Sequence, residues 1–287
     1  ALAYCKERLQ GRSPQGAKYP DQPADPIIVH PDIRRMLMTV KVFKEGARAL
    51  AYWAGLMVDI IRKHPDPETR QKTEDLLGLL TPVLKAYLTD TGFNSVNLCL
   101  QCFGGYGYIA ESGMEQFVRD VRITQIYEGA NGIQALDLTG RKLPANRGRA
   151  IQLFLAMVGG FCEKYKDSAA LSPFIKPLSE ALERLIEATQ WLMQQALADP
   201  DNGGAVSMDY LYIMALVTLG YQWAQVARVC ENPLSKPDDD SFDRAFYQSK
   251  WVCAKFFMEK VLPETMSHLA KIRAGADSLM TLPAEAF

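Results

Sequence analysis

Apolar residues recur every three or four positions along most of the chain. The clearest run covers residues 32–63, where one helical face carries Ile33, Met36, Val40, Phe43, Ala47, Leu50, Ala54, Met57 and Ile61. This spacing is that of an α-helix with one buried face. Pro31 suits the first turn of such a helix, and the segment from His64 to Pro67 ends it. We therefore predict one long helix here.

The same spacing predicts further helices before a break near residue 143. These helices are expected to cover about 68–89, 93–102, 114–125 and 130–142, separated by breaks at 90–92, 104–108 and Gly129. Pro82 is a possible interruption of the first of them. An irregular insertion with four prolines occupies residues 12–29 and is expected to be an exposed loop.

Residues 143–148 have the composition of a linker, and four or five amphipathic helices are expected after it. One of these helices carries Leu178, Leu182, Leu185, Thr189, Leu192 and Ala196. Another carries Phe242, Phe246, Ser249, Cys253 and Phe256. Clusters of turn-forming residues at 199–204 and 232–240 predict loops between the helices.

The helical pattern fixes the expected fold class. No strand-like alternation of apolar and polar residues persists anywhere in the chain. We predict an all-α protein made of two helical bundles in series, an up-down bundle over residues 1–146 and a second bundle over residues 147–287.

Composition excludes several function classes. The chain has 287 residues, of which 48% are hydrophobic, and a formal net charge of −1. That balance gives no electrostatic case for nucleic acid or an anionic membrane surface, and no apolar run is long enough to span a bilayer. The start has no basic signal-peptide region and no Met, and residues 4–8 read as the middle of a helix. We therefore expect a part of a longer protein.

The cysteines do not indicate a disulfide framework or a metal site. Six cysteines are irregularly spaced in a chain too large to need cross-links, which favours a reducing, cytoplasmic setting. Cys99 and Cys102 form a C-x-x-C pattern. A zinc site would need a second pair or two well-spaced histidines, and His30, His64 and His268 are scattered. We predict no metal site and interpret the two cysteines as small buried residues on a helix.

A glycine-rich segment at residues 101–108 is the first candidate for chemistry. Its sequence is Gln-Cys-Phe-Gly-Gly-Tyr-Gly-Tyr. Three glycines within four residues let the backbone turn sharply and approach another molecule closely. The segment does not follow a strand, so it is not a Rossmann fingerprint. From these residues alone, a tight corner between crossing helices is the other interpretation.

Glu128 is the second candidate. It lies between Tyr127 and Gly129, at the junction of two predicted helices, where a carboxylate can project into a cleft. Apolar neighbours such as Ile126 would disfavour its charged form, which suits a general base. The alternative from spacing alone is an exposed glutamate at a helix end.

Together the two segments resemble one family. The stretch from Gln101 to Leu143 closely resembles the C-terminal helical domain of the acyl-CoA dehydrogenases, which carries Q-x-x-G-G-x-G-Y, then R-D, then I-T-x-I-Y-E-G and a final helix. Each element is present here in that order. The segment from Ala3 to Arg8 also looks like the family's A-x-x-Y-x-x-x-R, less one spacer residue. The resemblance covers roughly residues 1–146 and implies an acyl-CoA dehydrogenase C-terminal-like up-down bundle.

The resemblance implies the α,β-dehydrogenation of an acyl-CoA thioester. In the family a glutamate removes the α-proton while a hydride passes from the β-carbon to N5 of FAD. Glu128 stands at the I-Y-E-G position of that base. The backbone N–H of the same glutamate helps bind the thioester oxygen, as an oxyanion hole does. Tyr127 and Gly129 match positions beside the substrate.

The same resemblance implies FAD as cofactor. The matching segment that touches FAD, commonly the FAD of a partner subunit, comprises Gln101, Cys102, Phe103, Gly104 and Gly105. Arg8 matches an arginine that contacts FAD phosphates across the same interface. Ala130, Asn131 and Gly132 stand where the family has T-S-E or T-S-Q, another FAD-contacting triplet. Backbone N–H groups at a helix start could serve in place of the missing Thr hydroxyl.

Several departures from the family pattern indicate a subgroup. His30-Pro31 lies where most members have a glutamine that helps bind FAD, and the proline-rich insertion precedes it. A further bundle follows Asn146. These features, with the ending at 282–287, resemble the long bacterial acyl-CoA dehydrogenases with a C-terminal extension, which include enzymes for long-chain acyl-CoA and 3-methylthiopropionyl-CoA.

The implied partners are an acyl-CoA substrate, an electron-transfer flavoprotein as electron acceptor, and further copies in a homodimer or larger assembly. The family's parts that hold the flavin ring and much of the acyl-CoA precede Ala1, so the isolated chain is expected to be inactive. The sequence does not give the acyl chain length.

Two alternatives come from other function classes. One is a non-catalytic helical scaffold descended from such an enzyme, which would have no reason to keep Glu128. The other is a DNA-associated homologue used in alkylation response, which would favour a basic surface rather than a net charge of −1.

Overall fold

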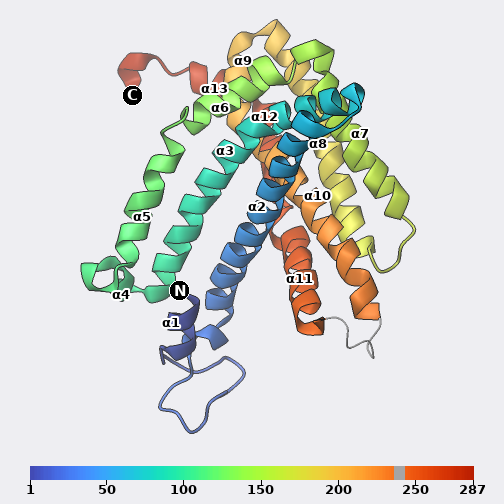
Figure 1. Ribbon diagram of the computed structural model, residues 1–287. Helices are drawn as coiled ribbons and strands as arrows, with labels where there is room; N and C mark the ends of the chain where they lie inside the picture. The colour runs from blue at the N-terminus through green and yellow to red at the C-terminus, as the bar shows by residue number, and fades with distance from the viewer. Residues whose placement is uncertain (236–242) are drawn as a thin grey trace. The chain divides into compact units, whose positions relative to one another are not determined.

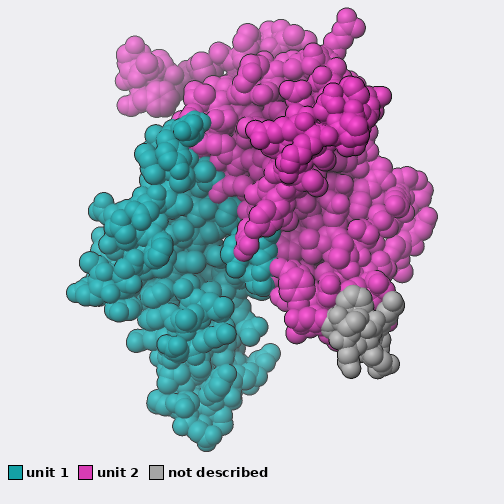
Figure 2. All heavy atoms as spheres, viewed as in Figure 1, with its two compact units in different colours: residues 1–45, 89–128 teal, residues 46–88, 129–287 magenta. Residues whose placement is uncertain are grey.

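A computed structural model of the chain describes residues 1–235 and 243–287 (Figure 1). Contacts divide the chain into two compact units (Figure 2). Unit 1 comprises Ala1–Glu45 and Thr89–Glu128, and unit 2 comprises Gly46–Leu88 and Gly129–Phe287. The unit boundaries after residues 45 and 88 fall inside two long helices, so each unit combines segments that are separate in the sequence.

Helices make up most of the described part of the chain, which confirms the all-α prediction. The α-helices are α1 (Leu2–Glu7), α2 (Pro31–Lys63), α3 (Pro67–Phe103), α4 (Gly105–Tyr108), α5 (Met114–Arg122), α6 (Asn131–Asp137), α7 (Ala145–Tyr165), α8 (Ser172–Ala198), α9 (Pro200–Ala205), α10 (Ser207–Ser235), α11 (Arg244–Phe256), α12 (Glu264–Ala274) and α13 (Asp277–Met280). Short 3₁₀ or π segments are η1 (Ile27–Val29), η2 (Ala110–Ser112), η3 (Ile123–Gln125), η4 (Leu138–Lys142), η5 (Phe257–Val261) and η6 (Ala284–Ala286). Among the described residues the β-structure is a single isolated bridge between Leu9 and Pro26.

Helix α2 follows its predicted pattern closely. It begins at Pro31, whose missing N–H is not needed in a first turn. None of the nine predicted core positions is exposed, and Met36, Leu50 and Met57 are fully buried. The period of three and four residues therefore identified the buried face correctly.

Helix α3 is longer than expected, and the predicted turn at residues 90–92 is wrong. The helix continues through Pro82 and through these residues to Phe103. Asp90 uses its carboxylate to accept a hydrogen bond of 2.7 Å from Gln125 Nε2, so its polar side chain serves a tertiary contact instead of a turn. Tertiary contacts of this kind override the weak turn preference of Asp, Thr and Gly.

Three other boundaries also differ from prediction. Residues 199–204 form no loop, because Asp199 caps α9 by accepting from the Asp201 N–H at 3.0 Å and Pro200 occupies the first turn. Residues 232–235 are the last turn of α10, whereas 236–240 and Phe242 lie outside the described residues. Arg8 is the extended residue that ends α1, not part of a helix middle.

Unit 2 packs around α10, which contacts α6, α8, α11 and α12. The largest side chains that this core encloses are Trp223, Tyr210, Phe154 and Phe174. The expected linker at 143–148 appears as a kink near the start of α7, where Asn146, Arg147 and Gly148 all have left-handed backbone angles. That run of positive φ values interrupts regular helix geometry within residues 143–148, and the residues on both sides of the kink belong to unit 2.

Three further findings concern the described part of the chain. No helix in residues 1–235 or 243–287 has the length and apolar character that crossing a membrane requires. All six cysteines are free thiols; Cys102 is buried and Cys99 half-buried, both on α3. The described side chains include no cluster of three or more His, Cys, Asp or Glu that could hold a metal ion.

Candidate functional site

A small apolar cluster in unit 1 joins α1, η1, α2 and α3. Its buried members are Cys5, Ile27, Met36 and Cys102. The Cys5 and Cys102 side chains are hydrogen-bonded, and burial raises the pKa of both thiols, that of Cys102 to about 12. Thiols kept in this protonated state pack as small apolar groups and are poor nucleophiles. The cluster thus forms the buried core beneath the surface that carries the pocket described next.

Above this cluster lies a pocket of about 680 Å³, which we call the Arg8 pocket. Its lining residues are Tyr4, Arg8, Gln10, Ile27, His30, Asp32, Ile33, Gln101, Cys102, Phe103, Gly104, Gly105 and Tyr106. The pocket therefore brings together Arg8 and the whole predicted segment from Gln101 to Gly105, although more than 90 positions separate them in sequence. Its volume is within the range of small-molecule sites.

Flat aromatic surfaces form one part of the pocket. The Tyr4 ring stacks on the Phe103 ring with centroids 4.3 Å apart and an interplanar angle of 15°. Tyr106 extends the same stack, at 6.1 Å from Tyr4 and 6.4 Å from Phe103. Offset aromatic stacks of this kind fix ring positions and leave polarisable faces at the edge of a pocket.

The glycines next to this stack have different roles. Gly104 has a φ of 60° and ends α3, which permits the chain to turn into α4. Gly107 is required by space, because a Cβ there would lie 2.7 Å from the Leu100 carbonyl oxygen. In contrast, nothing lies within 4 Å of a Cβ built at Gly104 or Gly105. Their backbone is open, as close approach by a ligand needs.

The electrostatic character of the pocket depends on Arg8. Among the described residues, no ion pair or hydrogen bond of its guanidinium is found, and the residue is exposed. The other charged lining residue, Asp32, is paired with Arg35 at 2.8 Å. The pocket therefore carries one uncompensated positive charge, which favours an anionic ligand.

Backbone hydrogen bonds join residues 8–11, which include Arg8, to the end of the 12–29 loop. The Ile27 N–H donates to the Arg8 carbonyl at 2.8 Å, the Gln10 N–H donates to the Asp25 carbonyl at 3.0 Å, and the Asp25 N–H donates to the Gly11 carbonyl at 2.9 Å. His30 Nε2 donates to the Gln10 carbonyl at 2.8 Å. The wall of the pocket thus extends into the predicted loop.

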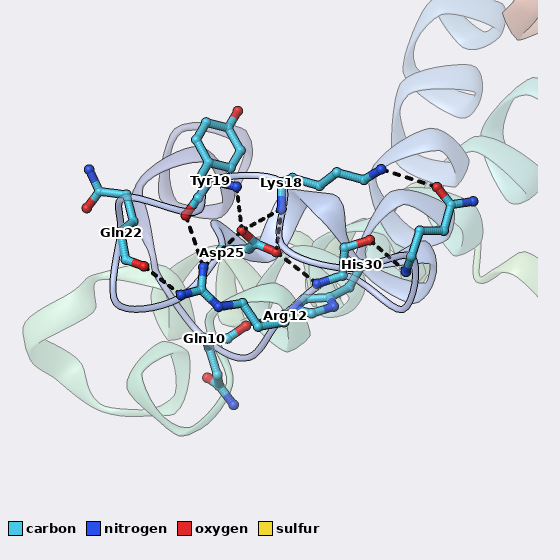
Figure 3. A network of polar contacts seen from close by, with 9 residues as sticks. Gln10, Arg12, Lys18, Tyr19, Gln22, Asp25 and His30 are labelled. Carbon is cyan, nitrogen blue, oxygen red and sulfur yellow. Dashed lines mark hydrogen bonds and ion pairs between the residues drawn. The ribbon is translucent and has the colours of Figure 1, made fainter.

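Asp25 organises that loop from within (Figure 3). Its carboxylate accepts from the N–H groups of Ser13 at 2.9 Å, Lys18 at 3.0 Å and Tyr19 at 2.8 Å. Arg12 lies 3.4 Å from the same carboxylate and also donates to the Tyr19 and Gln22 carbonyls. Burial opposes the charge, but the N–H groups and Arg12 outweigh it and lower the Asp25 pKa to about 2.

The exposed-loop prediction for residues 12–29 is therefore only partly correct. Most of the loop is exposed, but Asp25 is 0% exposed and Ser13 is 8% exposed. The carboxylate is surrounded by N–H groups of the loop's own backbone rather than by a hydrophobic core. The prolines identified an irregular segment, but they gave no indication of an ionised residue at its centre.

Glu128 ends unit 1 and has an unusual backbone. Its φ is 55°, and Gly129 follows with a φ of 79°. Such a conformation costs a non-glycine residue about 1–2 kcal/mol, and outliers of this kind concentrate at functional sites. Tyr127 and Glu128 are exposed and do not line the Arg8 pocket. Among the described residues, Ile126 is 51% exposed and does not provide the apolar enclosure expected around Glu128.

The turn before Glu128 is held by a residue that sequence reasoning missed. Gln125 donates to Asp90 on α3 at 2.7 Å and accepts from Arg122 at 3.2 Å. The Ile126 and Tyr127 N–H groups both donate to the Ile123 carbonyl, at 2.9 and 3.1 Å. No motif marks Gln125, because its role depends on a partner 35 residues away.

The predicted triplet Ala130, Asn131 and Gly132 lies in unit 2 at the start of α6. Asn131 is 6% exposed; its Oδ1 accepts from Lys85 Nζ at 2.6 Å, and its Nδ2 donates to the Ala86 carbonyl at 3.2 Å. This side chain ties α6 to α3. Ala130 and Gly132 are exposed.

Other pocket residues were also missed as site residues. Tyr4, Gln10, Asp32 and Tyr106 line the Arg8 pocket. His30, noted at the sequence level only as a departure from the family pattern, lines it too. Proximity to Arg8 and to Gly105 in sequence is the signal that could have found Gln10 and Tyr106.

Comparison with known proteins identifies the family. The sequence profile described as "Acyl-CoA dehydrogenase, C-terminal domain" matches residues 3–143, and that described as "Acetyl-CoA dehydrogenase C-terminal like" matches residues 154–283. Together they account for most of the chain. The chain belongs to the acyl-CoA dehydrogenase family and comprises C-terminal helical domains of that family.

Individual relatives agree with this assignment. A 3-methylmercaptopropionyl-CoA dehydrogenase of Ruegeria pomeroyi is 35% identical over 98% of the chain and 47% of that protein. A butyryl-CoA dehydrogenase of Syntrophomonas wolfei is 30% identical over 100% of the chain and 46% of that protein. A crystal structure of an acyl-CoA dehydrogenase complexed with FAD from Bacillus anthracis shares the fold, with a TM-score of 0.68 at 17% identity over 94% of the chain and 44% of that structure. The chain thus spans about half the length of these relatives.

Proposed function

We propose that this chain is the C-terminal part of an FAD-dependent acyl-CoA dehydrogenase that introduces an α,β double bond into an acyl-CoA thioester. The observation that carries the proposal is Glu128, a carboxylate at a left-handed position directly before a left-handed glycine. A strained, exposed carboxylate between an aromatic residue and glycine is a suitable proton acceptor for a substrate that approaches the turn.

In the proposed mechanism Glu128 removes the α-proton of the thioester. Its backbone N–H donates to the thioester oxygen as negative charge develops there. Tyr127 and Gly129 flank the substrate, and Gly129 leaves no side chain to obstruct it. FAD, when bound, supplies the acceptor for the hydride that leaves the β-carbon. The Gln125–Asp90 hydrogen bond keeps the turn that carries the base in place.

The Arg8 pocket supports the binding of part of an FAD molecule. The uncompensated guanidinium of Arg8 suits a phosphate, and the stack of Tyr4, Phe103 and Tyr106 suits a flat ring. The open backbone at Gly104 and Gly105 would contact the cofactor together with Gln101, Cys102 and Phe103. Apart from this pocket, Ala130, Asn131 and Gly132 of unit 2 would contact FAD through backbone groups, because the Asn131 side chain is already engaged by Lys85 and Ala86.

The proposal includes the domain organisation and the assembly. Residues 1–146 would form the dehydrogenase C-terminal domain and residues 147–287 its extension, with the left-handed kink at 146–148 as the boundary. The intact protein would be a homodimer or larger assembly in the cytoplasm and would pass electrons to an electron-transfer flavoprotein. The isolated chain would be inactive, because it spans only about half the length of the relatives that it matches.

The full-length protein tests the proposal. Purified protein should contain FAD, sediment as at least a dimer, and lose its flavin absorbance when straight-chain acyl-CoAs of increasing length are added under anaerobic conditions. The chain length that bleaches the flavin fastest would identify the substrate class. Full-length protein that holds no FAD, or holds FAD that no acyl-CoA reduces, would favour the non-catalytic scaffold.

A further inference from the structure

Asp25 does not line the Arg8 pocket, yet its backbone pairs directly with one residue that does, Gln10, and its chain neighbours lead to two more, Arg8 and Ile27. Its backbone N–H and carbonyl pair with Gly11 and Gln10, and the adjacent bridge joins Pro26 to Leu9. Ile27 then pairs with Arg8. Asp25 is therefore the point at which the loop and the wall of the pocket are joined.

The side chain of Asp25 closes the loop on itself. The N–H groups of Ser13, Lys18 and Tyr19 converge on one carboxylate, and Arg12 fastens the far side of the loop through the Tyr19 and Gln22 carbonyls (Figure 3). The Ser13 bond is buried and the Lys18 and Tyr19 bonds are part-buried. Loss of the shared acceptor is therefore unfavourable, most of all for the Ser13 N–H.

The geometry points to Asp25 as a positioning residue for FAD, one that fixes the backbone of Arg8, and so the point from which its guanidinium reaches the pocket, through the paired segments 8–11 and 25–27. This inference rests on the proposed function, and it gives the proline-rich insertion a role that sequence reasoning did not provide. The insertion directly precedes His30-Pro31, where the family glutamine is missing. A rigid loop that places Arg8 would compensate for that missing contact.

His30 takes part in the same arrangement. Its Nε2–H donates to the Gln10 carbonyl at 2.8 Å, so the ring carries its proton on Nε2. Gly11 has a φ of 68°, and a Cβ built there would be 3.6 Å from the imidazole ring. Residues 10 and 11 are thus held between the loop on one side and the imidazole on the other. This restricts the backbone conformation of the segment that begins at Arg8.

The test uses full-length protein stripped of FAD and titrated with FAD alone. Asp25→Asn keeps the shape of the side chain but replaces one acceptor oxygen with an NH₂ group and removes the charge. We expect the Kd for FAD to rise about tenfold, as when one charge-assisted contact is misplaced, with kcat at saturating FAD within about twofold of wild type. Asp21→Asn, an exposed aspartate of the same loop, is the matched control and should leave the Kd unchanged.

A double-mutant cycle separates positioning from general stability. If Asp25 acts through Arg8, Asp25→Asn should change the Kd by less than about twofold in an Arg8→Ala background. An equal tenfold loss in both backgrounds would overturn the inference, as would an unchanged Kd in Asp25→Asn alone. If Asp25→Asn does not fold, Arg12→Gln removes the outer fastening and should weaken FAD binding in the same direction. A wild-type protein that binds no FAD contradicts the proposed function itself, whereas normal FAD binding by both Asp25→Asn and Arg12→Gln contradicts only the role of the loop.

Discussion

Replacing Gly129 with alanine tests the geometry that presents Glu128. The φ of 79° at Gly129 is in the left-handed region, where an L-residue loses about 1–2 kcal/mol relative to glycine. A Cβ at this position would also lie 2.9 Å from Gln134 Nε2, so the amide of Gln134 must move. We expect Gly129→Ala to lower the free energy of unfolding by about 1–2 kcal/mol, which for a chain of this size lowers the Tm by about 2–8 °C.

Gly132→Ala is the matched control for stability. It makes the same chemical change three residues later, at a glycine in α6 where nothing lies within 4 Å of the added Cβ. Alanine there should be neutral or stabilising by up to about 1 kcal/mol, because alanine has the higher helix propensity. Thermal unfolding of both variants under the same conditions measures the difference. Equal Tm values for the two variants would refute the left-handed turn and with it the structural argument for Glu128.

Two further predictions concern the core of unit 2 and the 12–29 loop. Changing Phe154, which is 0% exposed, to alanine should lower the free energy of unfolding by about 3–5 kcal/mol, as measured by urea unfolding. A loss below about 1 kcal/mol would contradict its place in the core. Asp25 has its pKa lowered from 3.8 to about 2, so its stabilising effect is fully present above about pH 4 and is lost as the pH falls toward 2. The protection factors of the Ser13 and Tyr19 amides, which correct for the pH dependence of intrinsic exchange, should fall in that window, and unchanged protection factors at pH 2 would contradict an ionised Asp25 as their acceptor.

The sequence predicted those helices whose buried positions repeat at a regular spacing over many turns. Residues 32–63 form α2 with the expected buried face, because a long helix repeats the same signal many times. Local preferences were less reliable where a tertiary partner decides. Asp90 looked like part of a turn and instead accepts from Gln125 inside a continuous helix. Asp199-Pro200 looked like a loop and instead starts α9, although Asp followed by Pro is itself a helix-start signal.

The candidate site was predictable to the extent that motifs mark it. The family resemblance pointed to Arg8 and Gln101–Gly105, and the structure places them around one pocket. It did not point to Asp25, because a single aspartate among prolines carries no motif and its three N–H partners are recognisable only when the loop is folded. The cofactor contact predicted for Asn131 stays a prediction, and the resemblance gave no indication that its side chain packs against α3. Such side-chain partners depend on tertiary packing and are not encoded in spacing.

Glu128→Gln in the full-length protein is the measurement that tests the central claim most directly. Glutamine is nearly isosteric and keeps the backbone N–H, so the variant should retain FAD and bind acyl-CoA. It cannot accept the α-proton, and the rate of flavin bleaching on anaerobic mixing with substrate should fall by at least about 10²–10⁴. Bleaching at the wild-type rate, with a free energy of unfolding within about 0.5 kcal/mol of wild type, would show that Glu128 is a surface residue and that the base lies elsewhere.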